Sequence, residues 1–281
     1  MTGMVPVSDS LACKDGPVIR TVCNDRLFSR IDYPVAVDLD AEVFDDALPI
    51  RTVPQRPGAK HYTGKYFSYT VGTFVQCESI LEMKRAQIAD SDPTVVDIRS
   101  QPFRLVGRRN RRVCQYTPDF ALINRSGAVT IVEVKPKTRF DSDKVRRTLD
   151  WAERLFDVCG WSLQRWSLDP DDLLWKNITY LEGFHDPRLT TPEVTSTILE
   201  AVSEEPLRIE QLEAVVEQRI SDWPVLPAIK HLIWNGQLAI DLAAIKLNPT
   251  AFVAFGSQNR PDYLAPDAVA LRRHQLMGVV L

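Results

Sequence analysis

Two acidic residues and a lysine have the types and the spacing of a catalytic group. Glu133 lies 14 positions after Asp119, and Lys135 follows Glu133 by two. Between the acids, Asn124-Arg125-Ser126-Gly127 is typical of a hairpin turn whose glycine takes a positive φ. Such a hairpin would return the chain so that Glu133 lies beside Asp119. Because side chains alternate along a strand, Glu133 and Lys135 would share one face.

This group suits the hydrolysis of a phosphodiester. Asp119 and Glu133, with a backbone carbonyl, would form a hard-oxygen site for Mg²⁺, which Mn²⁺ is expected to replace. The metal would polarise the phosphate and lower the pKa of a water molecule. Lys135 would orient that water or stabilise charge on the phosphate. The pattern resembles the PD-(D/E)xK signature of metal-dependent nucleases, and the alternative is an edge hairpin with solvated charges.

Short motifs in a particular order extend the resemblance. The first opens a predicted helix that ends near Asp90, and the next two bound a predicted strand. Over residues 62–140 the order resembles the TnsA family, the endonuclease subunit of heteromeric cut-and-paste transposases. The motifs are Cys77-Glu78-Ser79-Ile80-Leu81-Glu82, Asp92-Pro93, Gln101-Pro102, Thr117-Pro118-Asp119-Phe120 and Glu133-Val134-Lys135-Pro136.

The resemblance implies a catalytic set, a fold and partners. The family's acids would be Glu82, Asp119 and Glu133, all of them metal ligands, and its lysine would be Lys135. The fold would be α/β, a restriction-endonuclease-like mixed sheet flanked by helices. The substrate would be DNA at transposon ends, of which this subunit cuts one strand. Its partners would be a TnsB-like transposase and a TnsC-like AAA+ ATPase.

The acid on the predicted helix has alternative interpretations. Ser79 and Glu82 also fit a capping box, in which Glu82 reaches back to the backbone N–H of Ser79. Glu78 lies one turn earlier on the same helix face and is the alternative acid. The resemblance favours Glu82, because the family's acid sits in the Leu-Glu pair.

Basic residues are concentrated around the catalytic group. Residues 59–186 contain 20 Lys and Arg against 17 Asp and Glu, whereas residues 1–58 and 187–281 are each net negative. A net positive middle segment suits a phosphate-binding surface. The run at 108–112 is expected to form a turn that contacts DNA phosphates without reading bases, and the alternative is a solvated loop. The candidate DNA-binding residues are Arg108, Arg109, Arg111, Arg112, Lys137 and Arg139.

The composition excludes several classes of protein. With 281 residues, 44% hydrophobic and 25% charged, the chain is long enough for two cores and ordinary for a globular protein. No apolar run approaches a membrane span, and the N-terminus lacks a signal-peptide pattern. Five scattered cysteines without a CxxC pair favour a reducing compartment and no zinc site. A bacterial cytoplasmic location without a membrane partner is therefore expected.

Three domains are predicted from composition and periodicity. Residues 1–58 are rich in proline and predict a loop-rich N-terminal extension, and residues 59–186 would form the nuclease domain. Residues 187–281 predict three helices followed by a β-hairpin, the layout of a winged helix. Its candidate recognition helix offers few basic groups, so this domain is expected to bind a protein partner.

Two other functions remain open at this level. A stand-alone PD-(D/E)xK restriction or repair nuclease would use the same residues, and the neighbouring genes would distinguish it from a transposase subunit. A non-catalytic assembly scaffold would tolerate decay of the site. The presence of Asp119, Glu133 and Lys135 argues against that decay.

Overall fold

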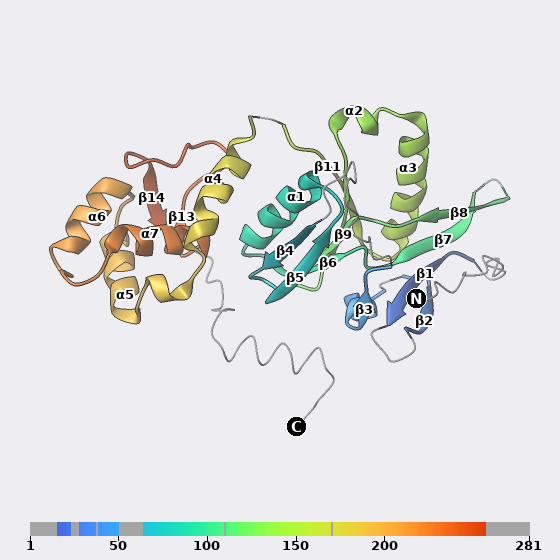
Figure 1. Ribbon diagram of the computed structural model, residues 1–281, viewed down its shortest axis with the longest axis horizontal. Coiled ribbons are helices and arrows are strands. Elements are labelled where there is room, and N and C mark those ends of the chain that lie inside the picture. Colours follow the sequence, from blue (N-terminus) through green and yellow to red (C-terminus); the bar gives the residue numbers. More distant parts are fainter. Residues whose placement is uncertain are drawn as a thin grey trace, which may run out of the picture. The chain divides into compact units, whose positions relative to one another are not determined.

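The chain folds as a mixed α/β protein with two compact units. The computed structural model describes residues 16–23, 28–37, 39–50, 64–109, 111–169 and 171–256. The described residues within Met1–Pro54 and Arg99–Trp166 form the first unit. Those within Gln55–Ile98 and Ser167–Leu281 form the second (Figure 1). Each unit therefore combines two separate stretches of sequence. None of the helices in the described ranges is long and apolar enough to cross a membrane.

The first unit contains a five-stranded antiparallel sheet. Its order is β2-β1-β7-β8, and β3 also pairs with β1. Strand β1 buries Ile19 and Thr21 and pairs with β7, where Val18 lies opposite Val106. Part of the expected N-terminal extension is thus a component of this sheet. The strands are β1 (Val18–Cys23), β2 (Arg30–Pro34), β3 (Ala47–Leu48), β7 (Arg104–Arg109) and β8 (Arg112–Tyr116).

A second sheet carries the predicted hairpin. Its order is β11-β10-β9-β6, with β10 antiparallel to β9 and parallel to β11. Strand β10 reads Val-Thr-Ile-Val-Glu-Val and is buried on both faces, as an interior strand of a mixed sheet requires. The hairpin predicted from the sequence is confirmed. The strands are β6 (Val95–Ser100), β9 (Phe120–Asn124), β10 (Val129–Val134) and β11 (Ser162–Trp166).

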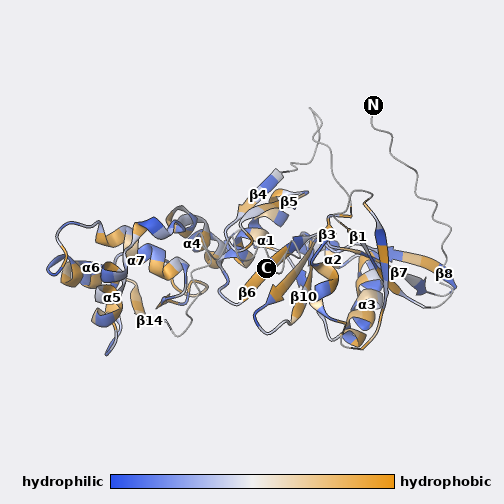
Figure 2. Ribbon diagram, turned by 90° about the horizontal axis from the view of Figure 1, so that it is seen from below, coloured by the Kyte–Doolittle hydropathy of each residue, from blue (hydrophilic) through white to orange (hydrophobic). Residues whose placement is uncertain are grey.

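Helix α3 (Asp143–Val158) lies between β10 and β11 in the sequence. It buries Leu149, Ala152 and Phe156 at helical spacing and leaves most of its charged residues exposed, as its two-coloured ribbon in Figure 2 shows. The short helix α2 (Lys137–Phe140) precedes it and has no buried residue.

An aromatic cluster forms the centre of the first unit. Phe44 lies in the 3₁₀ helix η1 (Ala41–Phe44), and its ring centroid is 5.7 Å from that of Phe103 and 5.1 Å from that of Trp161. Phe156 of α3 contacts Phe103 at 5.8 Å. The Trp161 indole also donates to the Leu39 carbonyl oxygen (2.9 Å). The N-terminal stretch is therefore fixed to the core that supports the hairpin.

The basic run at 108–112 contains the expected turn, which joins β7 to β8. Arg108 and Arg109 end β7, Arg112 begins β8, and Arg109 lies opposite Arg112. Arg111, with φ 65°, lies next to the tip. The predicted turn therefore lies inside the run, and the arginines on either side of it belong to the two strands. Strands β7 and β8 pair from Leu105 and Tyr116 as far as Arg109 and Arg112. The arginines therefore lie at the end of a two-stranded β-ribbon.

In the second unit, a buried carboxylate joins a hairpin to a helix. Asp90, near the end of α1, is fully buried and accepts four hydrogen bonds from the hairpin and its turn, which compensates for burial of its charge. Its donors are the hydroxyls of Tyr66 (2.8 Å) and Ser68 (2.6 Å) and the backbone N–H groups of Tyr69 (2.9 Å) and Thr70 (2.7 Å). The elements are β4 (Gly64–Ser68), β5 (Thr73–Cys77) and α1 (Ile80–Ser91).

Helix α4 (Leu173–Leu181) was not expected from the sequence, and it belongs to the core of the C-terminal helices. Ile178 and Leu181 are buried in the same cluster as residues of α5, α6 and α7. The Asn177 amide donates to the carbonyl oxygens of Leu242 and Ile245 (2.8 Å each). The following elements are η2 (Glu182–Phe184), η3 (Pro187–Leu189), α5 (Pro192–Ala201), β12 (Leu207–Arg208), α6 (Ile209–Glu217), α7 (Val225–Trp234), β13 (Leu238–Ala239) and β14 (Phe252–Phe255).

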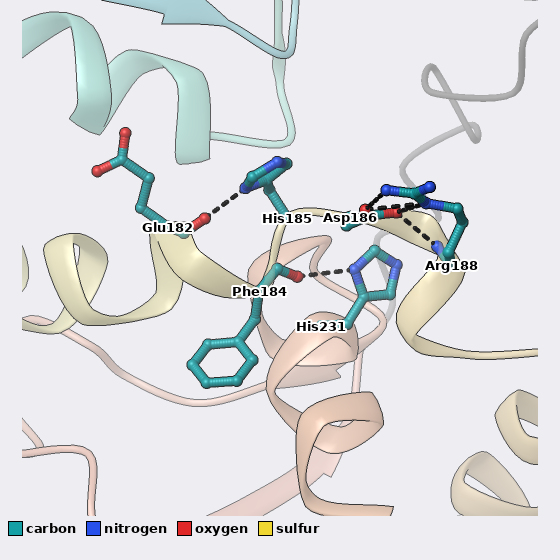
Figure 3. Close-up of polar contacts among 6 residues, drawn as sticks. All are labelled: Glu182, Phe184, His185, Asp186, Arg188 and His231. Atoms are coloured by element: carbon teal, nitrogen blue, oxygen red, sulfur yellow. Dashed lines mark hydrogen bonds and ion pairs between the residues drawn. The ribbon is translucent and has the colours of Figure 1, made fainter. Parts of the chain in front are cut away.

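A buried histidine connects α7 to the turn after α4. His231 Nδ1 donates to the Phe184 carbonyl oxygen (2.9 Å; Figure 3), and Nε2 accepts from the Asn235 amide (3.2 Å). Both contacts are made by a neutral imidazole protonated on Nδ1. In the same turn, Asp186 binds the guanidinium of Arg188 (Figure 3).

The C-terminal elements follow the predicted order. Three helices precede β13 and β14, which pair with each other, and β12 completes a small sheet in the order β12-β14-β13. This order is compatible with a winged helix, and that assignment stays a prediction.

Candidate active site

The turn of the β9–β10 hairpin is built by its own sequence. The Asn124 side chain accepts from the backbone N–H groups of Ser126 (3.0 Å) and Ala128 (2.9 Å). Gly127 has the positive φ (82°) that the turn requires, and its N–H donates to the Asn124 carbonyl oxygen. The turn sets Val132 opposite Phe120 and so brings the residue before β9 next to the end of β10.

Three hydrogen bonds fix Asp119 at this end of the hairpin. Its backbone N–H donates to the Val132 carbonyl oxygen (3.1 Å), and its carbonyl oxygen accepts from the Gln101 N–H (2.9 Å). Its side-chain Oδ2 accepts from the Val134 N–H (2.7 Å). The side chain is therefore fixed toward β10, and the residue is only 9% exposed.

Glu133 lies beside it, with one partner on each carboxylate oxygen. Oε2 accepts from the Tyr116 hydroxyl (2.8 Å), and Oε1 forms an ion pair with the Lys135 ammonium. Glu133 is 4% exposed, whereas the Lys135 side chain is 32% exposed. Lys135 thus joins a buried carboxylate to the surface, where a substrate phosphate could reach it.

Tyr116, at the end of β8, is a site residue to which the sequence patterns assign no role. Its pKa is raised well above 10 by burial and by the negative charges of Glu133 and Asp119. The hydroxyl therefore keeps its proton and stays a donor to Glu133. The only available signal was its position three residues before Asp119, which does not reveal a contact made across strands.

Gln101, whose backbone N–H bonds to Asp119, has a strained backbone conformation itself. It is a buried non-glycine residue with φ 44°, and its carbonyl oxygen accepts from the Ile50 N–H (2.9 Å) while its own N–H donates to Asp119. Left-handed conformations of such residues persist where surrounding contacts impose them, often at functional sites. Gln101 therefore supports the Asp119 backbone.

Glu82 belongs to the second unit, at the first turn of α1. Its Oε2 accepts from the Glu78 N–H (2.7 Å), its Oε1 accepts from the Ser79 hydroxyl (3.0 Å), and its own N–H donates to that hydroxyl (3.1 Å). These contacts resemble the expected capping box, except that the backbone donor is Glu78 and not Ser79. Glu82 thus has a structural role at the start of the helix.

The oxygen donors at the hairpin suit Mg²⁺ by type. Among the described residues, no group of three or more His, Cys, Asp and Glu side chains is placed to hold a metal ion. Asp119 and Glu133 form a pair of carboxylates. Mg²⁺ is commonly held by one or two carboxylates, with water and substrate phosphates as its other ligands. The pair therefore fits Mg²⁺ without needing a closed protein cage.

The candidate DNA-binding residues lie in two places in the first unit. Arg108, Arg109, Arg111 and Arg112 surround the tip of the β7–β8 ribbon, and within the described part of the chain none of them has an acidic partner. Arg109 alone is tethered, donating to the Arg147 carbonyl oxygen of α3 (2.6 Å). The other two candidates, Lys137 and Arg139, are exposed on α2.

We expect Tyr116→Phe to lower the free energy of unfolding by about 1–3 kcal/mol, because Glu133 Oε2 loses its donor in a buried place. Tyr180→Phe, at an exposed tyrosine, is the control and should change it by less than about 0.5 kcal/mol. Chemical denaturation measures both. Equal effects of the two substitutions would show that the Tyr116 hydroxyl does not support the site.

A protein-family model described as TnsA-like endonuclease N terminal matches residues 92–164. The matched segment contains Asp119, Glu133 and Lys135, and it does not include Glu82. A comparison with curated proteins gives no match. Residues 92–164 are thus similar to a TnsA-like endonuclease domain, which supports nuclease activity, a DNA substrate and a restriction-endonuclease-like fold for this part of the chain.

Proposed function

We propose that the chain is a Mg²⁺-dependent DNA endonuclease that cuts one strand at transposon ends. The observation that carries this proposal is the buried pair of Asp119 and Glu133 joined to the partly exposed Lys135. Two neighbouring carboxylates with an ammonium group provide negative charge for a metal and positive charge for a phosphate. A purely structural hairpin has no need to bury two acids together, because that burial costs free energy.

Asp119 and Glu133 are the proposed ligands of the metal, with Glu82 as a third acid acting directly or through water. When bound, Mg²⁺ supplies a Lewis acid for the phosphate and makes a water molecule more acidic. Val134 N–H and the Tyr116 hydroxyl orient the two carboxylates, one donor to each. Each carboxylate therefore has a fixed orientation before substrate binds, which reduces the reorganisation needed for the reaction.

Lys135 is proposed to act on the reacting phosphate. Its backbone N–H donates to the Trp166 carbonyl oxygen (3.1 Å), which fixes the chain where β10 ends. The ammonium group is held by Glu133 and is accessible to solvent. It is placed to orient the attacking water or to stabilise charge that develops on the phosphate.

The β7–β8 ribbon is proposed as a DNA contact. Exposed arginines without acidic partners among the described residues keep their charge available for phosphates. Lys137 and Arg139 on α2 would extend this contact, since α2 follows directly after Lys135. Such contacts supply affinity that depends on salt and not on base sequence.

The role in transposition is proposed from the family resemblance of residues 92–164. We further propose TnsB-like and TnsC-like partners, a nuclease domain at 59–186 and a winged-helix-like domain at 187–281 that binds a partner. The order of α5, α6, α7, β13 and β14 supports the last of these. The exposed Phe255 on β14 offers an aromatic contact for such a partner.

Asp119→Asn should abolish cleavage, with a loss of at least about 100-fold, because a metal contributes several kcal/mol to such reactions. The matched control is Asp141→Asn, an exposed acid just beyond α2. Nicking of supercoiled plasmid DNA in Mg²⁺ measures the rate, and calorimetric titration with Mn²⁺ measures metal binding. Wild-type activity of Asp119→Asn would refute the proposed site.

Lys135→Ala should lower the single-turnover cleavage rate about 10- to 100-fold and change the Kd for DNA little, because its role is in the transition state. Lys137→Ala, two residues further on and fully on the surface, should weaken binding and leave the rate of the bound complex unchanged. If Lys135→Ala affected binding alone, Lys135 would be an ordinary phosphate contact.

Arg108→Gln combined with Arg112→Gln should flatten the dependence of log K on log salt by about 2, because two fewer counterions are released. Arg109 is left intact because it holds α3. Arg154→Gln, exposed toward the other end of α3, controls for the loss of a charge elsewhere. Filter binding to duplex DNA at several salt concentrations gives the slopes, and an unchanged slope in the double variant would exclude the ribbon as a contact.

A further inference from the structure

A second cation lies beside Glu133, on the neighbouring strand of the same sheet. Arg165 of β11 is the register partner of Glu133, and Lys135 follows Glu133 along the chain. Strands β10 and β11 are parallel, and register partners project their side chains from the same face of a sheet. Neighbouring strands are only about 4.8 Å apart. Glu133 therefore has one cation along its own chain and another across the sheet.

Two acids of helix α3 hold the Arg165 guanidinium by one of its nitrogens. Nη2 donates to Asp150 Oδ1 and to Glu153 Oε2, both at 2.7 Å. Asp150 and Glu153 lie one turn apart on the same face of α3. A guanidinium also carries N–H donors on Nε and Nη1. Within the described part of the chain, both contacts of this guanidinium use Nη2, so Nε and Nη1 remain able to donate to a further acceptor.

The guanidinium is open to solvent, as a contact with substrate requires. The Arg165 side chain is 36% exposed, close to the 32% of Lys135. The Asp150 and Glu153 side chains are 42% and 41% exposed. Ion pairs between groups this exposed contribute little to stability, because water screens them. A tie between β11 and α3 is therefore a weak reason for an arginine at this position.

The charge of Arg165 reaches the catalytic group. Burial and the charges of Glu133 and Asp119 raise the pKa of Tyr116, and the positive charge of Arg165 opposes them. The Tyr116 hydroxyl donates to Glu133 Oε2 (2.8 Å), so Arg165 acts on the surroundings of the same carboxylate. Lys135 and Arg165 thus place two positive charges beside the pair of acids, where a polyanion such as DNA would have to approach.

We propose that Arg165 binds a second phosphate of the DNA backbone, next to the phosphate on which Lys135 acts. Nε and Nη1 would donate to the phosphate oxygens while Nη2 stays on Asp150 and Glu153. A guanidinium suits this task, because its planar fork of donors matches the oxygens of a phosphate and it keeps its charge. The inference rests on the proposed action on DNA, and it adds a contact that positions the strand to be cut.

Binding of duplex DNA by the full-length chain tests this contact, with Ca²⁺ in place of Mg²⁺ and with plasmid nicking in Mg²⁺ followed separately. Arg165→Gln should raise the Kd about tenfold and lower the slope of log K against log salt by about 1, because one charge-assisted phosphate contact is lost. Asp150→Asn combined with Glu153→Gln should not weaken binding, because Arg165 is kept and two repelling charges are removed. Arg154→Gln, exposed on α3, is the control for loss of a charge and should change the Kd less than about twofold.

Two results would overturn the inference. An unchanged Kd and salt slope in Arg165→Gln would show that no phosphate is bound there. Equal losses of binding in Arg165→Gln and in the variant that lacks both acids would show that Arg165 only ties β11 to α3. Cleavage is judged apart from this contact: a wild-type chain that bound DNA without nicking it would contradict the nuclease proposal alone, and one that bound no duplex DNA would contradict both.

Discussion

The site depends on one constraint: two carboxylates lie next to each other in a largely buried place. Asp119 and Glu133 are 9% and 4% exposed, and neither can be buried as a charge without compensation. The compensation comes from three donors of different kinds: a backbone N–H from Val134, a hydroxyl from Tyr116 and the ammonium of Lys135. Each donor also fixes the orientation of the carboxylate to which it binds. The same hydrogen bonds that compensate for burial of the two charges therefore position them in the site.

These donors come from strands of two different sheets. Strand β10 carries Glu133 and the Val134 amide, whereas Tyr116 ends β8 of the five-stranded sheet. The same β8, through its pairing with β7, forms the arginine-rich ribbon. One antiparallel ladder therefore has the Tyr116 donor to Glu133 at one end and a cluster of arginines at the other.

The second unit shows the same use of buried polar groups for positioning. Asp90 fixes the β4–β5 turn to the end of α1, and Glu82 organises the start of the same helix. Gln87 of α1 donates to Glu182 (2.8 Å), whose pKa is raised by burial and by the charge of Asp90. Helix α1 is therefore anchored at both ends and to the turn after α4. The orientation of Glu82 is set by its contacts with Glu78 and Ser79 at the start of the helix.

The sequence by itself determined the hairpin, its turn and the residues Asp119, Glu133 and Lys135, because turn chemistry and strand alternation act over fewer than about ten residues. It also gave the order of the C-terminal helices, whose apolar periodicity is local. Only the tertiary structure decided that Tyr116 meets Glu133, that the arginines at 108–112 extend a ribbon, and that α4 joins the C-terminal core. These outcomes depend on contacts between distant segments, such as Trp161 with Leu39, 122 positions apart. No local preference encodes which buried group will find which partner, because burial is a property of the assembled fold.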